Sequence, residues 1–166
     1  MRKELEPDME IAEKLYSQIK GLIEKYTEYC DEYGDGEEIE YKNLENKLYE
    51  ITGKDISQYN LSEYSEEEGL EVLSFRISLP EPKIVSDITE EEVTEIVKRI
   101  KSDVFQESNE NNFKNIFHCY LGDYYHKLLK RNFKKYKYEY FNSQKGNDGK
   151  YFKYTTEEIA RKIWGT

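Results

Sequence analysis

The sequence predicts an α+β fold that is mostly helical, with about five helices and a small antiparallel sheet. Apolar residues recur at three- and four-residue steps through most of the chain, which is the period of a helix. In residues 72–79 and again near residues 136–154, large apolar or aromatic residues alternate with polar ones, which is the period of a strand. The 166 residues contain no repeat and no low-complexity linker, so we expect a single domain over residues 1–166.

Residues 8–32 and 37–52 are expected to form two amphipathic helices. Asp8 follows a proline and can accept a hydrogen bond from the first turn of the first helix. Gly53 stands in the stop position of the second helix, where a left-handed residue commonly ends the helical backbone.

Residues 72–79 are expected to form a strand with one buried face. Its apolar positions alternate with serine and arginine, and they are Leu73, Phe75, Ile77 and Leu79. Pro80 and Pro82 should end the strand, because proline has no N–H group to donate to a neighbouring strand.

A capping box at residues 89–92 is the clearest local pattern in the chain. The Thr89 hydroxyl can accept from the Glu92 N–H group while the Glu92 carboxylate accepts from the Thr89 N–H group. We expect a helix from this point to about residue 103. A longer helix with an apolar stripe over residues 113–129 is expected at the centre of the core.

Two interpretations fit residues 134–141, namely a strand and a continued helix. Tyrosines alternate there with charged residues, at Tyr136, Tyr138 and Tyr140. We prefer a hairpin near residues 136–154, because residues 146–149 have the composition of a turn. A second capping box, Thr155 to Glu158, should open the last helix.

Charge is unevenly distributed along the chain. The net charge is −10, but residues 124–166 have a net charge of +7 and residues 1–123 a net charge of −17. This asymmetry predicts one basic and one acidic region, which either attract different partners or face each other and partly neutralise.

No segment carries a specific catalytic or cofactor pattern. Asp123 and His126 share a helix face, with His118 nearby, but the chain lacks the second carboxylate–histidine pair and the assignable third ligand of known metal sites. Cys119 follows His118 directly, and adjacent residues on a helix do not face each other. We therefore expect no enzyme activity, no cofactor and no metal site.

The expected location is the cytoplasm, with no membrane partner. The first residues lack the apolar core of a secretory signal, and no apolar run approaches the ~18 residues of a membrane span. Cys30 and Cys119 are then expected to be reduced.

Six carboxylates are the candidate residues of an acidic, partner-binding face: Asp35, Glu37, Glu38, Glu66, Glu67 and Glu68. Carboxylates interspersed with tyrosines can attract a basic protein and steer its association. Lys, Asn, Ile, Tyr and Glu are frequent while Ala, Gly, Pro and Arg are scarce, which is typical of an AT-rich genome. The leading hypothesis is a non-enzymatic protein-binding inhibitor from an AT-rich bacterium or its phage. It would be an immunity protein that neutralises a toxin, such as a nuclease, or an anti-defence protein of a phage.

The alternative hypothesis is a nucleic-acid-binding module. Its candidate residues are Lys130, Arg131, Lys134, Lys135, Lys137, Tyr136 and Tyr138. Lysines can neutralise phosphates, and tyrosine rings can stack on unpaired bases. A third hypothesis is a metal-dependent enzyme that uses His118, Asp123 and His126.

Overall fold

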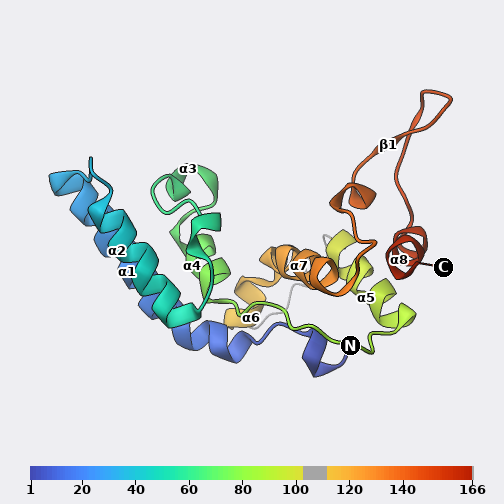
Figure 1. Cartoon of the computed structure of the whole chain (residues 1–166), viewed down its shortest axis with the longest axis horizontal. Coiled ribbons are helices and arrows are strands. Elements are labelled where there is room, and N and C mark those ends of the chain that lie inside the picture. The colour runs from blue at the N-terminus through green and yellow to red at the C-terminus, as the bar shows by residue number, and fades with distance from the viewer. Residues whose placement is uncertain (103–111, 166) are drawn as a thin grey trace. The chain divides into compact units, whose positions relative to one another are not determined.

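The computed structural model describes residues 1–102 and 112–165, with the side chains of residues 65 and 67 left out. The chain divides into two compact units (Figure 1). The first unit comprises Met1–Pro7, Glu81–Asn111 and His118–Thr166, and the second comprises Asp8–Pro80 and Asn112–Phe117. The single domain expected from the chain length stays a prediction. The mostly helical α+β class is confirmed.

The second unit is built on two long helices that run side by side, α1 and α2 (Figure 1). Its helical elements are α1 (Met9–Tyr33), α2 (Ile39–Thr52), η2 (Ile56–Gln58), α3 (Tyr64–Glu67), α4 (Leu70–Ser78) and α6 (Phe113–Ile116). The Asp8 carboxylate accepts a hydrogen bond from the Ile11 N–H group at 3.2 Å, and Gly53 ends α2 with φ of 67°. Both expected helix ends are therefore confirmed.

The core of the second unit lies where α1, α2 and α4 meet. Its buried members from these helices are Ile19, Ile23, Leu44, Leu48, Leu73 and Ile77. The connecting segment between α2 and α4 adds Ile56, Tyr59, Leu61 and Tyr64 to the same cluster. The Tyr64 hydroxyl also lies 2.7 Å from the Thr27 hydroxyl, which ties α3 to α1.

The strand expected over residues 72–79 is wrong, because this segment is the helix α4. The helix is buried on most of its surface, so it has no polar face from which its period could be read. Its serines are tolerated because their hydroxyls bond within the helix: Ser74 donates to the Leu70 carbonyl at 2.6 Å and Ser78 to the Phe75 carbonyl at 2.8 Å.

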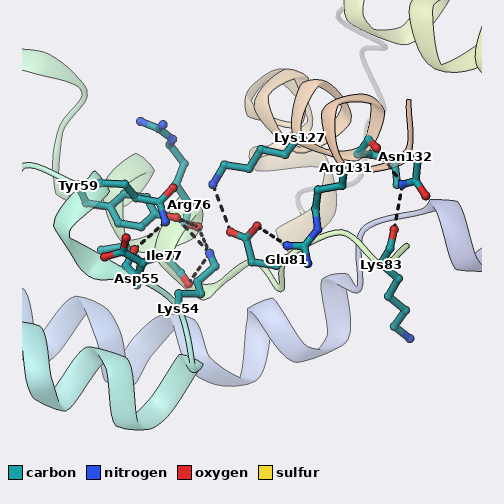
Figure 2. A network of polar contacts seen from close by, with 12 residues as sticks. Lys54, Asp55, Tyr59, Arg76, Ile77, Glu81, Lys83, Lys127, Arg131 and Asn132 are labelled. Atoms are coloured by element: carbon teal, nitrogen blue, oxygen red, sulfur yellow. Dashed lines mark hydrogen bonds and ion pairs between the residues drawn. The ribbon is translucent and has the colours of Figure 1, made fainter. Parts of the chain in front are cut away.

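Lys54 closes the C-terminal end of α4. Its side chain is almost fully buried, and its ammonium donates to the carbonyls of Arg76 and Ile77 at 2.8 and 3.0 Å (Figure 2). It also donates to the Tyr59 hydroxyl at 3.2 Å. The last carbonyls of a helix lack partners within the helix, and a cation there is favoured by the helix dipole. One side chain thus satisfies several buried polar groups.

We expect Lys54→Met to lower the free energy of unfolding by about 1–3 kcal/mol, because the buried Ile77 carbonyl loses its ammonium donor and the Arg76 carbonyl keeps only the weaker bond from the Tyr59 hydroxyl at 3.3 Å. Denaturant unfolding followed by circular dichroism measures this loss. Lys47→Met is the matched control, since Lys47 is an exposed lysine of α2. Equal unfolding midpoints for the two variants would contradict the role given to Lys54.

The first unit packs helices α5, α7 and α8 around a second set of buried residues. Its elements are η1 (Lys3–Leu5), α5 (Glu90–Lys101), η3 (His118–Tyr120), α7 (Gly122–Asn132), η4 (Tyr138–Phe141), β1 (Gln144–Lys145), β2 (Tyr151–Phe152) and α8 (Thr156–Trp164). Buried side chains of this unit include Val93, Ile96, Val97, Leu128, Leu129, Ile159 and Ile163. Both expected capping boxes, at the starts of α5 and α8, are confirmed. Residue 103, the expected end of the first of these helices, lies outside the described residues.

A partly buried ion pair holds the N-terminal segment within the first unit. Arg99 of α5 donates to the Glu6 carboxylate at 2.8 Å and to the Tyr125 hydroxyl at 2.9 Å. The Tyr125 hydroxyl in turn donates to the same carboxylate at 3.2 Å. Burial raises the pKa of Tyr125 to about 12, so the phenol stays protonated and able to donate.

The single helix expected over residues 113–129 is broken. A 3₁₀ turn separates α6 from α7, which begins at Gly122. The apolar stripe serves two different cores. Phe117 stacks on Phe75 of the second unit with ring centroids 4.4 Å apart, whereas Leu128 is buried in the first unit. Helical spacing alone does not report which core a residue joins.

A small antiparallel sheet near the C-terminus is confirmed, although its strands have two residues each. Gln144 pairs with Phe152 and Lys145 with Tyr151.

Residues 134–141 form neither the expected strand nor a continued α-helix, because η4 occupies the end of this segment. Asn132, the last residue of α7, joins the helix to the segment after α4: its side chain accepts from the Val85 N–H group at 2.7 Å and donates to the Lys83 carbonyl at 3.0 Å (Figure 2).

Candidate functional site

The excess negative charge of the chain belongs to the second unit. Its sequence contains 19 Asp and Glu residues against eight Lys and Arg residues, a net charge of −11. The first unit contains 16 acidic and 17 basic residues, a net charge of +1. The first unit is therefore close to neutral, whereas the second unit is strongly acidic.

Two of the six carboxylates predicted to bind a partner have local structural roles. Asp35 accepts hydrogen bonds from the backbone N–H groups of Glu40 and Tyr41 at 3.3 and 2.8 Å, and it thereby caps α2. Glu68 accepts two hydrogen bonds from Arg76, at 2.7 and 2.9 Å. Both carboxylates are occupied within the second unit.

The other predicted carboxylates lie in two separate places. Glu37 and Glu38 are exposed in the turn between α1 and α2, and Glu66 is exposed on α3. Figure 1 shows that turn and α3 apart from each other within the second unit. The side chain of Glu67 lies outside the described residues. The five carboxylates whose side chains are described are thus not gathered in one place, and the role of the six residues in binding stays a prediction.

The turn between α1 and α2 exposes large side chains that the sequence reasoning missed. Tyr33 is 67% exposed and Ile39 is 55% exposed, and Tyr29 lies one helical turn before Tyr33, with 5.2 Å between the two ring centroids. We call this region the α1–α2 tip, and it comprises Tyr29, Asp31, Glu32, Tyr33, Glu37, Glu38 and Ile39. The available signal was a group of large side chains within five residues of the glycine-containing turn.

Carboxylates flank the tyrosines of the α1–α2 tip along the chain. Asp31, Glu32, Glu37 and Glu38 are all exposed. A hydrogen bond with Glu32 raises the pKa of the Tyr33 phenol. Glu38 has φ of 56°, a left-handed conformation that costs a non-glycine residue about 1–2 kcal/mol. The tip therefore combines negative charge, aromatic surface and a strained backbone position.

In the first unit, the basic tyrosine-rich segment forms an open depression of about 400 Å³. It is lined by His126, Lys127, Lys130, Tyr136, Lys137, Tyr138 and Glu139. Four of the seven residues predicted to bind nucleic acid line it: Lys130, Tyr136, Lys137 and Tyr138. The other three lie outside its lining. Arg131 forms an ion pair with Glu81, Lys135 donates to the Gly165 carbonyl, and Lys134 is exposed.

His126 organises the aromatic side of this depression. Its Nδ1 atom lies 2.8 Å from the Tyr136 hydroxyl, and its ring centroid lies 4.7 Å from that of Tyr138 and 4.6 Å from that of Phe141. Burial lowers the pKa of His126, and the Asp123 carboxylate opposes this effect only in part. This role could not be predicted from the sequence, because the partners of His126 lie ten and more residues away along the chain.

The third hypothesis gains no support from the structure. Within residues 1–102 and 112–165, no three His, Cys, Asp or Glu side chains are grouped closely enough to hold a metal ion. His118 is exposed in η3, whereas His126 is partly buried in α7. Cys30 and Cys119 are free thiols, and Cys119 is exposed.

Over the same described ranges, none of the helices is long and apolar enough to cross a membrane.

Comparisons of the chain with protein-family models, with curated proteins and with solved structures found no match.

The environment of His126 predicts a pH dependence of stability. Burial favours the neutral imidazole, so the stability that it contributes is present above about pH 6.5, the usual pKa of histidine, and is lost as the pH falls below that value. We expect NMR titration to give His126 a pKa below 6.5. Unfolding free energies measured from pH 7 to pH 5 should fall less steeply in His126→Gln than in the original chain. His118→Asn, which removes an exposed histidine, is the control.

Proposed function

We propose that this protein is a non-enzymatic inhibitor that binds a basic protein partner through the α1–α2 tip. The observation that carries the proposal is the presence of exposed tyrosine and isoleucine side chains among carboxylates, on a unit with a net charge of −11. The α1–α2 tip replaces the six-residue acidic face as the proposed binding surface, because Asp35 and Glu68 are already occupied by local partners.

The composition of the tip suits protein recognition. Tyrosine is enriched among the residues that dominate binding energy at interfaces, because it contributes a large ring and few rotatable bonds. The surrounding carboxylates contribute in a different way, by steering a positively charged partner and by disfavouring an acidic one. Tyr33 and Ile39 are therefore the proposed anchors, and Glu32 and Glu37 are the proposed steering charges.

The proposed partner class is a toxin or a defence protein with a basic active surface, such as a nuclease. A nuclease site must attract phosphates, so it carries positive charge that an acidic tip can cover. The proposed role is that of an immunity protein or a phage anti-defence protein, acting in the bacterial cytoplasm. What supports this partner class is charge complementarity.

A capture experiment with matched variants tests the proposal. The bait is the full chain, and the lysate of the native host is treated with nuclease before capture. The tip variant is Glu32→Lys/Glu37→Lys, and the control is Glu13→Lys/Glu50→Lys, which makes the same charge change at exposed sites away from the tip. We expect one basic protein in stoichiometric amount with the original chain and the control, and its loss with the tip variant.

The captured partner then allows a quantitative test. We expect Tyr33→Ala to weaken its binding by about 30-fold or more, as for an interface residue that contributes 2 kcal/mol. Circular dichroism checks that each variant is folded. Equal capture of the partner by the tip variant and by the control would overturn the proposed surface. Capture of nucleic acid alone would overturn the proposed function.

A further inference from the structure

We propose that the depression of the first unit is a binding site for a nucleotide, in which Lys130 and Lys137 hold the phosphate and Tyr138 stacks on the base. This site is independent of the α1–α2 tip, because every lining residue belongs to the first unit. The ligand class is a phosphate next to an unpaired aromatic base. A free nucleotide and a nucleotide within a single strand both have this chemistry.

The cations of the depression differ in how far they are already neutralised. Lys127 forms an ion pair with Glu81 at 3.2 Å, and Arg131 forms one with the same carboxylate at 3.4 Å (Figure 2). Within the described part of the chain, neither Lys130 nor Lys137 forms an ion pair. These two ammonium groups are therefore available to an anion.

One carboxylate in the lining opposes this attraction. Glu139 lines the depression together with Lys130 and Lys137, so these three side chains together have a net charge of +1. Lys127, Arg131 and Glu81 together add another positive charge, and Asp123, whose charge acts on His126 and Tyr136, subtracts one, which leaves a net charge of +1. The depression is thus net positive, and a phosphate group that replaces water between Lys130 and Lys137 gains more attraction than repulsion.

The aromatic side of the depression is held in place and yet accessible. Tyr138 is 56% exposed although its ring contacts His126. Tyr136 is half-buried, and the contact between its hydroxyl and His126 Nδ1 fixes it against α7. An exposed ring with a supported position is what base stacking requires, and each stacked base adds about 1–3 kcal/mol in single-strand-binding proteins.

The size and openness of the depression favour a single unstacked nucleotide. A volume of about 400 Å³ falls within the 300–1,000 Å³ range of small-molecule sites. A duplex keeps its bases stacked on one another and offers no free base face to Tyr138. The net charge of the whole chain, −10, does not oppose this site, because the first unit has a net charge of +1.

Isothermal titration of the full chain tests this site with four probes. They are inorganic phosphate, adenosine monophosphate, a ten-nucleotide single strand and the corresponding duplex. The test variant is Lys130→Ala/Lys137→Ala, and the matched control is Lys145→Ala/Lys153→Ala, which removes two exposed lysines of the same unit. Tyr138→Leu removes the stacking ring while it keeps an apolar side chain.

We expect the single strand to bind the original chain and the control with equal affinity, and the test variant at least tenfold more weakly. The slope of log K against log salt should fall by about 1.4 in the test variant, since each lost phosphate contact removes about 0.7 for a single strand. Tyr138→Leu should weaken binding about 5-fold to 160-fold. The NMR signals of His126 should shift when the probe binds, because its ring contacts Tyr138.

The probes also separate the two sources of the ligand. Binding of both adenosine monophosphate and the single strand supports a site complete for one nucleotide, and binding of the single strand alone supports a site within a nucleic-acid surface. Equal binding of phosphate and nucleotide, unchanged in Tyr138→Leu, would overturn the stacking role. Unchanged binding in Lys130→Ala/Lys137→Ala, or no binding of any probe, would overturn the site, and neither result bears on the α1–α2 tip.

Discussion

Backbone carbonyls at the end of a buried helix must find donors, and this constraint shapes the second unit. α4 is buried on most of its surface, so water cannot serve its C-terminal carbonyls. Lys54 supplies the donors from the segment after α2, and that segment also brings Ile56 and Tyr59 into the core. The ammonium can be buried because three oxygen atoms accept its hydrogen bonds. The core of α1, α2 and α4 is therefore organised around a polar contact as well as apolar ones.

The features that the sequence predicted correctly are those that depend on neighbouring residues. The cap at Asp8 and the boxes at Thr89 and Thr155 involve groups three residues apart, so local chemistry is enough to define them. The errors lie where distant residues decide. The sequence of α4 alternates like that of a strand because serines occupy buried positions, which they can do since their hydroxyls bond to carbonyls of the same helix. The helix expected over residues 113–129 is broken, and its two parts contribute to different cores.

The candidate sites divide in the same way. Sequence composition identified the lysines and tyrosines of the depression, because they are close together along the chain. It did not identify His126 as their centre, since its contacts to Tyr136, Tyr138 and Phe141 cross the end of α7. It also gave Asp35 and Glu68 an external role, although their local partners are a helix N-terminus and Arg76. A carboxylate in an acidic cluster is informative only after its local partners are known.

The division of charge between the two units removes an apparent conflict between an acidic protein and a phosphate site. A total charge of −10 describes neither surface, because salt screens exposed charges beyond about 8 Å at physiological ionic strength. A partner at the α1–α2 tip responds to Glu32, Glu37 and their neighbours, and a phosphate at the depression responds to Lys130 and Lys137. The acidic tip and the basic depression share no residue, so they can select opposite ligands on one chain.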